Sequence, residues 1–571
     1  MKLMNLSRGR LVACAGVVAL SAGALAGGLF AAQGALAADA PVTFKTIVLG
    51  VGADEHSRYV TWYASGDAAS VVQLEKTKDL NKGAFDEDAV SFPAEIVATT
   101  GTSTGDVARA PFRGSALLKD FDANSEYSYR VLASDGSASP TYTFKTSSFG
   151  IGKGFTFAAF GDPQIGAESS NNRESISADL QEDAAGWVDT LNVLQKDAAN
   201  DGLPLELLTS TGDQIETANV ESQWDAWFQP EQLRSIPYAA AIGNHDSSDL
   251  GYRYHFALPN NDVTTPELQT GAGGDYWYTY KGVLFVVINS NAQSSTKNPA
   301  HIDFVRKAVE ANPSAQWKVV SYHHAIYSPA SHANDTDAVG RRPSFTQGFS
   351  DLGINLVLQG HDHSYSRSYV LRNGGEGAER QNAAEQRGAD SVFEGPGGVV
   401  YVTTNSASGS KYYGLTEPRV GTTSDATLNG RYNLETMPYA AAGANAANGT
   451  PAGTHALHWA NSVENQDNVR TYLKVEVTSK SLTVSNVVAG VCDYPNKATT
   501  QGRETWCGAA QGPLTLVDTD GNGVYNANQP ATGAPAKPSN ALADKFVTST
   551  GVDPVGTVQD SVTITRDRSA K

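Results

Sequence analysis

Five apolar runs of this chain are each followed directly by residues that can bind metal ions or reacting groups. The runs have the length and apolar character of buried strands. Because the carboxyl ends of parallel strands meet at one edge of an α/β sheet, we expect the polar residues that follow them to lie close together. The five segments are Phe155–Gln164, Leu205–Glu216, Pro237–Asp246, Trp317–His324 and Ile354–His363.

Each of these segments has a simpler interpretation when it is taken alone. A Gly-Asp or Gly-Asn pair is typical of turns, and a His-x-His pair such as His361 and His363 is more often an ordinary surface or core pair than a metal site. Five such segments in this order are hard to explain by turns alone. The sequence therefore predicts an α/β domain with a site at the carboxyl edge of its sheet.

The ordered set resembles the calcineurin-like metallophosphoesterase superfamily. The continuation His361-Asp362-His363-Ser364-Tyr365-Ser366-Arg367 resembles the purple acid phosphatases within it. The resemblance extends over about residues 155–370 and implies a four-layer α/β/β/α domain with two divalent or trivalent metal ions, Fe, Mn or Zn. Two ions about 3.5–4 Å apart can clamp the attacking and leaving oxygens of a phosphoryl group, and metal-bound water supplies hydroxide near neutral pH.

The resemblance also implies a role for each matching residue. His245 would act on the substrate without binding metal, and Asp246 would fix the tautomer of His245 by hydrogen bonding. The implied metal ligands are Asp162 and His363 for one ion, Asn244, His323 and His361 for the other, and Asp213 as the bridge between both.

Two positions depart from the family patterns. Purple acid phosphatases have a tyrosine ligand to ferric iron three residues after the bridging aspartate, where this chain has Glu216. Many other relatives have a histidine two residues after the first aspartate, where this chain has Gln164. Either side chain could offer an oxygen to the first metal ion. Glu216 could equally be an acidic residue in the first turn of the next helix, where the helix dipole favours it.

Residues 1–37 have the pattern of a secretory signal peptide. Positive residues precede an apolar stretch, and Ala35-Leu36-Ala37 forms an A-x-A cleavage site. We therefore expect a secreted, extracellular protein whose mature chain begins at Ala38. No later segment is long and apolar enough to predict a membrane span. The formal net charge of −18 argues against electrostatic binding to nucleic acid.

Three further regions complete the predicted domain organisation. Residues 38–148 contain short β-branched and aromatic runs separated by turn residues, which predicts an all-β domain. This region resembles the fibronectin type III-like sandwich that precedes the catalytic domain in plant-type purple acid phosphatases, and it could border the site or contact cell-surface material. Residues 149–490 would form the catalytic domain, and residues 491–571 a C-terminal tail or small module.

Several residues outside the core motifs are candidates for substrate binding. His332, Arg341 and Arg342 follow the His323 motif in a predicted loop. An arginine there could bind phosphate through two hydrogen bonds, although a solvated surface loop is the simpler interpretation. Tyr365 matches a pocket tyrosine of the family that does not bind metal.

The C-terminal region holds two more candidates. Cys492 and Cys507 are the only cysteines that remain after signal removal, and a disulfide between them is the default in a secreted chain. Residues 518–529 match the start of an EF-hand calcium loop but have Gln529 where the motif needs glutamate. The candidate calcium ligands are Asp518, Asp520 and Asn522.

The sequence favours one function over two others. Hydrolysis of phosphomonoesters, on a small phosphorylated substrate, is the best-supported reaction class. Hydrolysis of phosphodiesters or nucleotides on the same metal core is the alternative within enzymes. A catalytically inactive surface-binding protein is the third hypothesis, and the presence of Asp213, Asn244 and His245 argues against it.

Overall fold

The computed structural model describes most of the chain downstream of the predicted signal peptide. The described residues are 40–105, 107–167, 176–374, 377–413, 436–439, 453–456, 458–465, 469–490, 545–548 and 551–566. The predicted signal peptide, the cysteine pair Cys492 and Cys507, and the calcium candidates Asp518, Asp520 and Asn522 lie outside these residues. Among the described helices, none combines the length and the apolar character that a membrane crossing requires.

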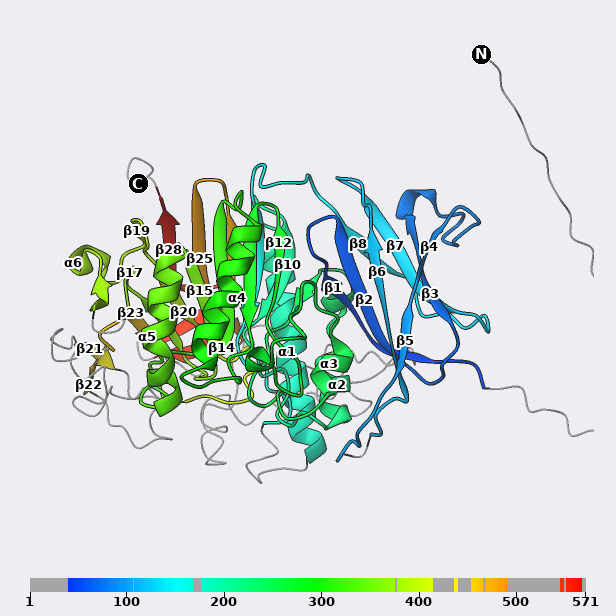
Figure 1. Cartoon of the computed structure of the whole chain (residues 1–571), viewed down its shortest axis with the longest axis horizontal. Helices are drawn as coiled ribbons and strands as arrows, with labels where there is room; N and C mark the ends of the chain where they lie inside the picture. The colour runs from blue at the N-terminus through cyan, green and yellow to red at the C-terminus, as the bar shows by residue number, and fades with distance from the viewer. Residues whose placement is uncertain are drawn as a thin grey trace, which may run out of the picture. The chain divides into compact units, whose positions relative to one another are not determined.

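The N-terminal region is all-β, as the sequence predicts, with eight strands drawn in blue to cyan in Figure 1. Its core is built from side chains of both sheets, among them Trp62, Leu118 and Tyr129. The first sheet holds β1 (Phe44–Val51), β2 (Ser57–Ala64), β6 (Phe112–Lys119) and β5 (Glu95–Ala98); the second holds β4 (Val90–Pro93), β3 (Ser70–Lys76), β7 (Glu126–Ala133) and β8 (Tyr142–Lys145). Its fibronectin type III-like identity stays a prediction.

The region that the sequence predicts to be catalytic, called the catalytic region below, contains two larger sheets. One has eleven strands, because β1, β2, β6 and β5 extend it at one end, and its β9, β10 and β11 run parallel. Its other strands are β9 (Phe155–Phe160), β10 (Leu205–Ser210), β11 (Tyr238–Ala239), β24 (Arg470–Val477), β25 (Ser481–Gly490), β28 (Val558–Thr565) and β19 (Ser391–Phe393).

The second sheet has seven strands, of which β13, β14, β15 and β20 are parallel. Its strands are β12 (Tyr276–Tyr280), β13 (Val283–Ile288), β14 (Trp317–His324), β15 (Leu356–Gly360), β20 (Val400–Thr403), β16 (Tyr365–Ser368) and β23 (Asn461–Asn465). Short hairpins pair β17 (Leu371–Arg372) with β18 (Glu379–Arg380), β21 (Thr436–Tyr439) with β22 (Gly453–Ala456), and β26 (Lys545–Thr548) with β27 (Gly551–Pro554).

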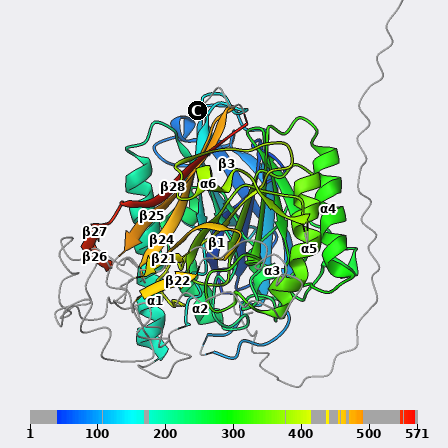
Figure 2. The ribbon, with the colours of Figure 1, turned by 90° about the vertical axis from the view of Figure 1, so that its left-hand side faces the viewer.

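The two sheets face each other and helices cover their outer faces, which confirms the four-layer architecture. Apolar side chains fill the space between the sheets, where Phe157 packs edge-on against Phe285. Figure 2 shows α1 on one side of the strands and α4 and α5 on the other. The helices are α1 (Ile176–Ala198), α2 (Glu221–Trp227), α3 (Gly251–His255), α4 (Lys297–Ala311), α5 (Thr336–Asp351) and α6 (Ala383–Gln386), with 3-10 turns at η1 (Thr77–Asp79), η3 (Glu231–Arg234) and η4 (Pro266–Leu268).

Strand pairing, a hydrogen bond and an ion pair join the N-terminal sandwich to the catalytic region, in addition to the covalent chain. Strand β1 lies parallel to β11, with Gly50 opposite Tyr238. The Tyr129 hydroxyl donates to the Arg234 carbonyl at 2.8 Å, and Lys45 pairs with Asp225 of α2 at 3.0 Å. The sheet therefore runs across the boundary that the sequence suggests near residue 148.

The region predicted as a C-terminal tail also contributes to the catalytic sheet. Strand β28 pairs antiparallel with β25 and parallel with β19, so residues 558–565 are part of the domain rather than of a separate tail. Val562 and Ile564 are fully buried between the two sheets. The sequence hides this strand because it follows β25 only after a long intervening segment.

A buried ionic cluster lies where the sandwich meets α2. Arg109 Nε donates to Glu221 Oε1 at 2.6 Å, the Tyr63 hydroxyl lies 3.4 Å from the same oxygen, and His255 Nε2 lies 3.7 Å from Glu221 Oε2. Burial acts to raise the pKa of the Glu221 carboxyl. The interactions of Glu221 with His255 and Arg109 outweigh that effect and hold this pKa at about 2.

We predict that Glu221 contributes to acid sensitivity. A carboxyl whose pKa falls from 4.5 in the unfolded chain to about 2 in the folded protein stabilises the fold above pH 4.5, and this contribution disappears as the pH falls toward 2. The full contribution is about 3 kcal/mol by the pKa difference. Glu221→Gln should therefore lower the unfolding temperature strongly at pH 6 and much less at pH 2.5. Thermal unfolding across this pH range measures the difference.

Glu95 supplies the matched control for this experiment, because its carboxyl is mostly exposed and lies 3.8 Å from Arg113. Glu95→Gln should leave the unfolding temperature nearly unchanged at both pH values. A loss of stability in Glu221→Gln that stays constant from pH 6 to pH 2.5 would show that the ionised Glu221 does not carry the effect.

Candidate metal centre

The candidate ligands lie where strands of the two facing sheets end. Asp162 and Asp213 follow β9 and β10 of one sheet, while His323 is the next-to-last residue of β14 and His361 follows β15 of the other. Asp162, Asp213 and His361 have φ values of +39°, +51° and +75°, in the left-handed region that residues other than glycine seldom occupy. Such conformations concentrate at functional sites, where the surrounding structure holds them in place.

Two glycines of the motifs leave room for the carboxylates. A Cβ atom on Gly243 would lie 1.9 Å from Asp213 Oδ1, and one on Gly360 would lie 2.6 Å from Asp162 Oδ2. Real Cβ atoms essentially never approach other atoms this closely. The Gly-Asp, Gly-Asn and Gly-His motifs are therefore more than turns, because their glycines allow the backbone to approach the site.

The strongest evidence for a metal centre is the contact between acceptor atoms around His323. Asp213, His323 and His361 offer ligand atoms that all lie within 4.8 Å of one another. His323 Nδ1 donates to the Thr211 carbonyl at 2.9 Å, so in the neutral ring Nε2 carries a lone pair. That atom lies 3.2 Å from Asp213 Oδ2, which is also an acceptor. A cation is the ligand that such an arrangement fits.

Other predicted ligands surround the same point. Asn244 Oδ1 lies 2.8 Å and His361 Nδ1 lies 3.1 Å from His323 Nε2. On the other side of the site, His363 Nε2 lies 3.7 Å from Asp162 Oδ1. His363 Nδ1 donates to the Lys411 carbonyl at 2.8 Å, which turns Nε2 toward Asp162. Metal-ligating histidines commonly donate their second N–H in this way. The structure thus brings together all six predicted ligands.

The charge state of the buried groups also fits cations. Burial lowers the pKa of His361 and His363 well below the usual histidine value, which favours the neutral, ligating form. Burial and the charge of Asp213 raise the pKa of Asp162. Burial also acts to raise the pKa of Asp213, but positive charge on the side of His323 and His245 lowers it overall. A second positive centre would let both carboxylates ionise.

Gln164 and Glu216, the two departures from the family patterns, contact each other. Gln164 Nε2 donates to Glu216 Oε2 at 2.6 Å. Among the described residues, Gln164 Oε1 is a buried oxygen that accepts no hydrogen bond, which fits a ligand oxygen. Helix α2 begins at Glu221, so Glu216 does not occupy its first turn and the helix-dipole interpretation is wrong.

His245 lies beside the ligands, but Asp246 does not orient it. His245 Nδ1 lies 2.7 Å from the Glu216 carbonyl, which accepts from it and leaves Nε2 turned toward Asp213 Oδ2 at 4.0 Å. Asp246 instead accepts hydrogen bonds from the backbone N–H of Gln214 and Gly243. The predicted role of Asp246 is therefore corrected: this fully buried carboxylate holds two motif backbones together, and a carbonyl fixes the tautomer of His245.

Three of the predicted substrate-binding side chains are buried away from the site. Arg341 and Arg342 lie in helix α5 and not in a loop, a result that Gly340 and Pro343 obscured because both residues disfavour helix interiors. Arg341 pairs with Asp337 at 2.7 Å and donates to the Ser290 carbonyl, while Arg342 donates to the carbonyls of Ile326 and Ala333. These two arginines support the loop after β14.

The prediction that Tyr365 lies in the substrate pocket is likewise corrected. Its buried hydroxyl donates to Asp560 Oδ2 of β28 at 2.6 Å, and Arg367 donates to both oxygens of the same carboxylate. The tyrosine and arginine at the end of the His361 motif therefore anchor the last strand of the sheet and do not line a pocket.

His332 does reach the site, contrary to the simpler interpretation of a solvated loop. Its ring stacks on His361 with centroids 3.8 Å apart, and its Nδ1 lies 2.7 Å from Asp335. Tyr413 was missed by the sequence analysis. Its ring lies 5.1 Å from His363 and 5.4 Å from His332, and it follows Lys411, whose carbonyl holds His363. No local motif marks Tyr413, because it enters from a loop about 50 residues after His363.

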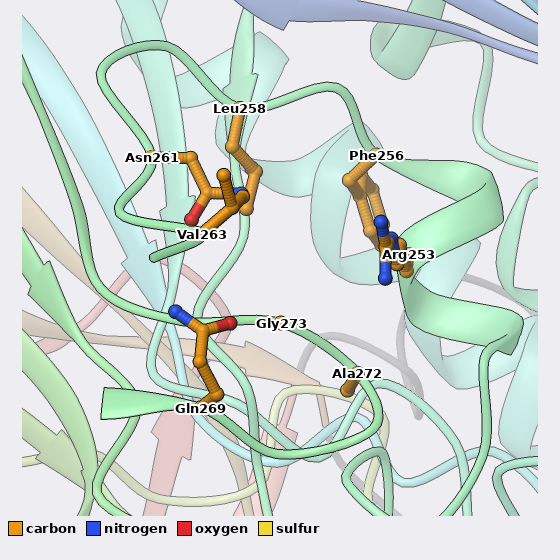
Figure 3. A pocket seen from close by; sticks show the side chains of 8 residues that line it. All are labelled: Arg253, Phe256, Leu258, Asn261, Val263, Gln269, Ala272 and Gly273. Atoms are coloured by element: carbon orange, nitrogen blue, oxygen red, sulfur yellow. The ribbon is translucent and has the colours of Figure 1, made fainter. Parts of the chain in front are cut away.

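A separate small cavity lies away from these residues. It has a volume of about 90 Å³ and is lined by residues of the segment 253–273, among them Arg253, Phe256 and Val263 (Figure 3). None of the predicted ligands contributes to it. Its size suits a few water molecules and not a phosphorylated substrate.

Comparisons with known proteins agree with this geometry. Residues 155–365 match the family model described as calcineurin-like phosphoesterase. The chain is 26% identical over 168 residues to a phosphoenolpyruvate phosphatase of Allium cepa and 26% identical over 160 residues to purple acid phosphatase 1 of Ipomoea batatas. These matches span 28% and 27% of this chain and only about a third, 34%, of each relative.

A solved structure extends the likeness to the whole fold. Purple acid phosphatase PPD1 from yellow lupin (Lupinus luteus) seeds aligns with a TM-score of 0.56 and 15% identity, over 93% of this chain and 75% of the lupin chain. At this identity the comparison concerns the fold alone. The chain therefore has the purple acid phosphatase-like fold, with all-β sheets before the catalytic domain.

We predict that Asp213 is required for metal binding. Asp213→Asn removes the carboxylate charge but keeps an oxygen that can accept from the His245 N–H, a bond of 2.9 Å, so the fold should remain. Elemental analysis should find the metal content reduced from about two ions per chain to one or fewer. Asp225→Asn, which removes a carboxylate that pairs with Lys45, is the control. A full metal complement in folded Asp213→Asn would remove Asp213 from the bridging role.

Proposed function

Because residues 155–365 match the calcineurin-like phosphoesterase family model, we propose that this protein is a metal-dependent hydrolase of phosphomonoesters. The observation that carries the proposal is the convergence of Asp213, His323 and His361 at the edge where the two sheets meet. Acceptor groups in contact at the bottom of a buried site fit cations, and cations fit a doubly charged phosphate monoester. Purple acid phosphatases among the relatives support the same reaction class.

The proposal assigns the donors to two metal ions. Asp162, His363 and the free oxygen of Gln164 would hold one, Asn244, His323 and His361 the other, and Asp213 both. When bound, the ions would supply Lewis acidity toward phosphoryl oxygens and acidify water. The imidazole rings of His323 and His363 are already oriented for this by backbone carbonyls, so these two rings need little reorganisation on binding.

His245 is proposed as the group that acts on the substrate. With Nδ1 donating to the Glu216 carbonyl, Nε2 is the atom free to exchange a proton or to approach a phosphoryl oxygen. Its side chain is 26% exposed, whereas that of His323 is fully buried, so His245 is the more accessible of the two from solvent. His332 and Tyr413 are proposed to flank the substrate beside His361 and His363.

We expect His245→Ala to reduce kcat by roughly 10²–10⁴-fold, the usual effect of a positioned acid or base. Metal content should stay unchanged. If His245 protonates the leaving oxygen, the loss should be smaller for p-nitrophenyl phosphate than for phenyl phosphate, whose leaving group is poorer. Steady-state kinetics on both esters, with elemental analysis of the same samples, measures these effects. Loss of metal in proportion to activity would make His245 a ligand.

Monoester preference is the finer part of the proposal and has its own test. The purified protein would be assayed with p-nitrophenyl phosphate and with bis(p-nitrophenyl) phosphate, after loading with Mn²⁺, Zn²⁺ or Fe²⁺. A higher kcat/KM for the monoester supports the proposal. A higher value for the diester favours the phosphodiesterase alternative, and no turnover of either ester with a full metal complement favours an inactive binding protein.

We predict that the active enzyme is colourless and works with divalent metals. The purple colour of the family arises from a tyrosine phenolate on ferric iron, and Glu216 occupies that tyrosine's position. Oxygen donors make the first site harder, which suits Mn²⁺, Fe²⁺ or Mg²⁺, and the nitrogen of His363 also permits Zn²⁺. A visible spectrum of active, metal-replete protein tests this.

Two tyrosines serve as controls for the colour experiment. The Tyr365 hydroxyl already donates to Asp560, so Tyr365→Phe should not change the spectrum. Tyr413 is the described phenol whose ring contacts His363. A strong visible band that disappears in Tyr413→Phe would show a phenolate–ferric site and overturn the prediction.

Export from the cell is also proposed, from the sequence pattern of residues 1–37 alone. N-terminal sequencing of protein recovered outside the cells should begin at Ala38. A chain found only inside the cells with Met1 intact would contradict it.

A further inference from the structure

One loop of the N-terminal sandwich reaches the segments that carry Glu216 and His245. The loop connects β5 to β6 and covers residues 99–111. Its Thr104 N–H donates to the Asn219 carbonyl at 3.2 Å, and its Ser103 hydroxyl accepts from the Glu221 N–H at 3.3 Å. Its Thr100 N–H donates to the Tyr254 hydroxyl at 2.9 Å. The loop therefore lies against both segments at once.

Arg109 is the centre of these contacts. Its guanidinium donates to Glu221 Oε1 at 2.6 Å, to Asp249 Oδ1, and to the Thr100 carbonyl at 2.9 Å. It lies 5.5 Å from the centroid of the Tyr254 ring, and its side chain is only 3% exposed. A planar guanidinium that donates in three directions holds its acceptors in fixed relative positions.

The two carboxylates bound by Arg109 belong to two segments, residues 216–221 and 245–249, and each carboxylate is at the C-terminal end of its segment. Glu221 lies five residues after Glu216, and Asp249 lies four residues after His245. The segments touch at their other ends, where His245 Nδ1 donates to the Glu216 carbonyl at 2.7 Å. The chain just after Asp249 also packs closely on the Glu216 segment, because a Cβ atom on Gly251 would lie 2.6 Å from the Ala218 carbonyl oxygen.

Loss of the guanidinium would act first on these segments. Glu221 is fully buried and Asp249 is mostly buried, so without Arg109 both carboxylates would lose the cation that pairs with them. Breaking a buried ion pair in this way is strongly destabilising locally. The sandwich would stay attached, because Lys45 still pairs with Asp225 and Tyr129 still donates to Arg234.

We propose that Arg109 is a positioning residue for the reaction, which the N-terminal sandwich contributes to the catalytic domain. By tying Glu221 to Asp249 it fixes the distance between the Glu216 and His245 segments, and so holds His245 over the metal ligands. The inference rests on the proposed function for its kinetic part only. Its structural part concerns two loops and can be measured in an inactive protein.

The test compares Arg109→Met with Lys45→Met in the full chain. Both substitutions remove a cation of the sandwich that pairs with a carboxylate of α2, but only Arg109 contacts Asp249. In Arg109→Met, hydrogen–deuterium exchange of residues 216–221 and 244–250 should rise about tenfold or more. The same peptides in Lys45→Met should exchange as in the unsubstituted protein. Arg109→Lys, which keeps the charge without the three-way geometry, should be intermediate, and it carries the comparison if Arg109→Met does not fold.

The kinetic part uses a double-mutant cycle with His245→Ala. Arg109→Met should lower kcat for phenyl phosphate by about 10–100-fold with little change in KM, because a misplacement of about 1 Å can cost 10²-fold. In the His245→Ala background the same substitution should cost less than about threefold, since it acts through His245.

Two results would overturn the proposal. Multiplicative losses in the double variant would mean that Arg109 does not act through His245, and unchanged exchange of both segments in Arg109→Met would mean that it does not hold them. If the unsubstituted, metal-loaded protein hydrolyses no phosphoester, the proposed function fails, while the exchange comparison still decides whether Arg109 joins the two segments.

Discussion

The contact between His323 Nε2 and Asp213 Oδ2 is the interaction on which the rest of the site depends. Two lone-pair atoms 3.2 Å apart repel each other unless a cation lies against both. Hydrogen bonds to neighbouring backbone maintain this contact. His323 Nδ1 donates to the Thr211 carbonyl, and the backbone N–H of His245 donates to Asp213 Oδ1. The left-handed backbone at Asp162, Asp213 and His361 adds conformational strain to this repulsion. The protein therefore holds these acceptor groups in positions that fit a bound cation.

Much of the supporting structure comes from outside the catalytic sequence motifs. Asp246 joins two motif backbones, Arg109 arrives from the sandwich, and Asp560 arrives from the far end of the sheet. Each is a buried polar side chain with several partners, and each contacts a segment that also carries a candidate ligand or His245. The inner donors are therefore held by a second set of polar contacts that are widely separated in sequence.

The strands and the convergence of the candidate ligands were predictable because their signals are local. An apolar run followed by Gly-Asp or Gly-His can be recognised within about ten residues. The polar residues that follow these strands then lie together where the strands of both sheets end. The orientation of side chains beyond the motifs was not predictable in this way. The positions of Arg341 and Arg342 depend on a helix that Pro343 makes hard to predict. The Tyr365 hydroxyl is oriented by its hydrogen bond to Asp560, and the Asp246 carboxyl by the backbone N–H groups of Gln214 and Gly243. Tyr413 and Arg109 depend on loops that only the folded chain brings to the site.

The place of β28 in the sheet has a consequence for the order in which the chain folds. Among the described strands, β19 joins the eleven-stranded sheet through β28, and both Tyr365 and Arg367 donate to Asp560. During synthesis from the N-terminus, residues 365–393 would emerge well before residues 558–565, so a buried hydroxyl, a guanidinium and a sheet edge stay uncovered for most of that interval. At about 5–20 residues per second this delay lasts on the order of ten seconds or more. The eleven-stranded sheet can therefore be completed only after residues 558–565 have been synthesised.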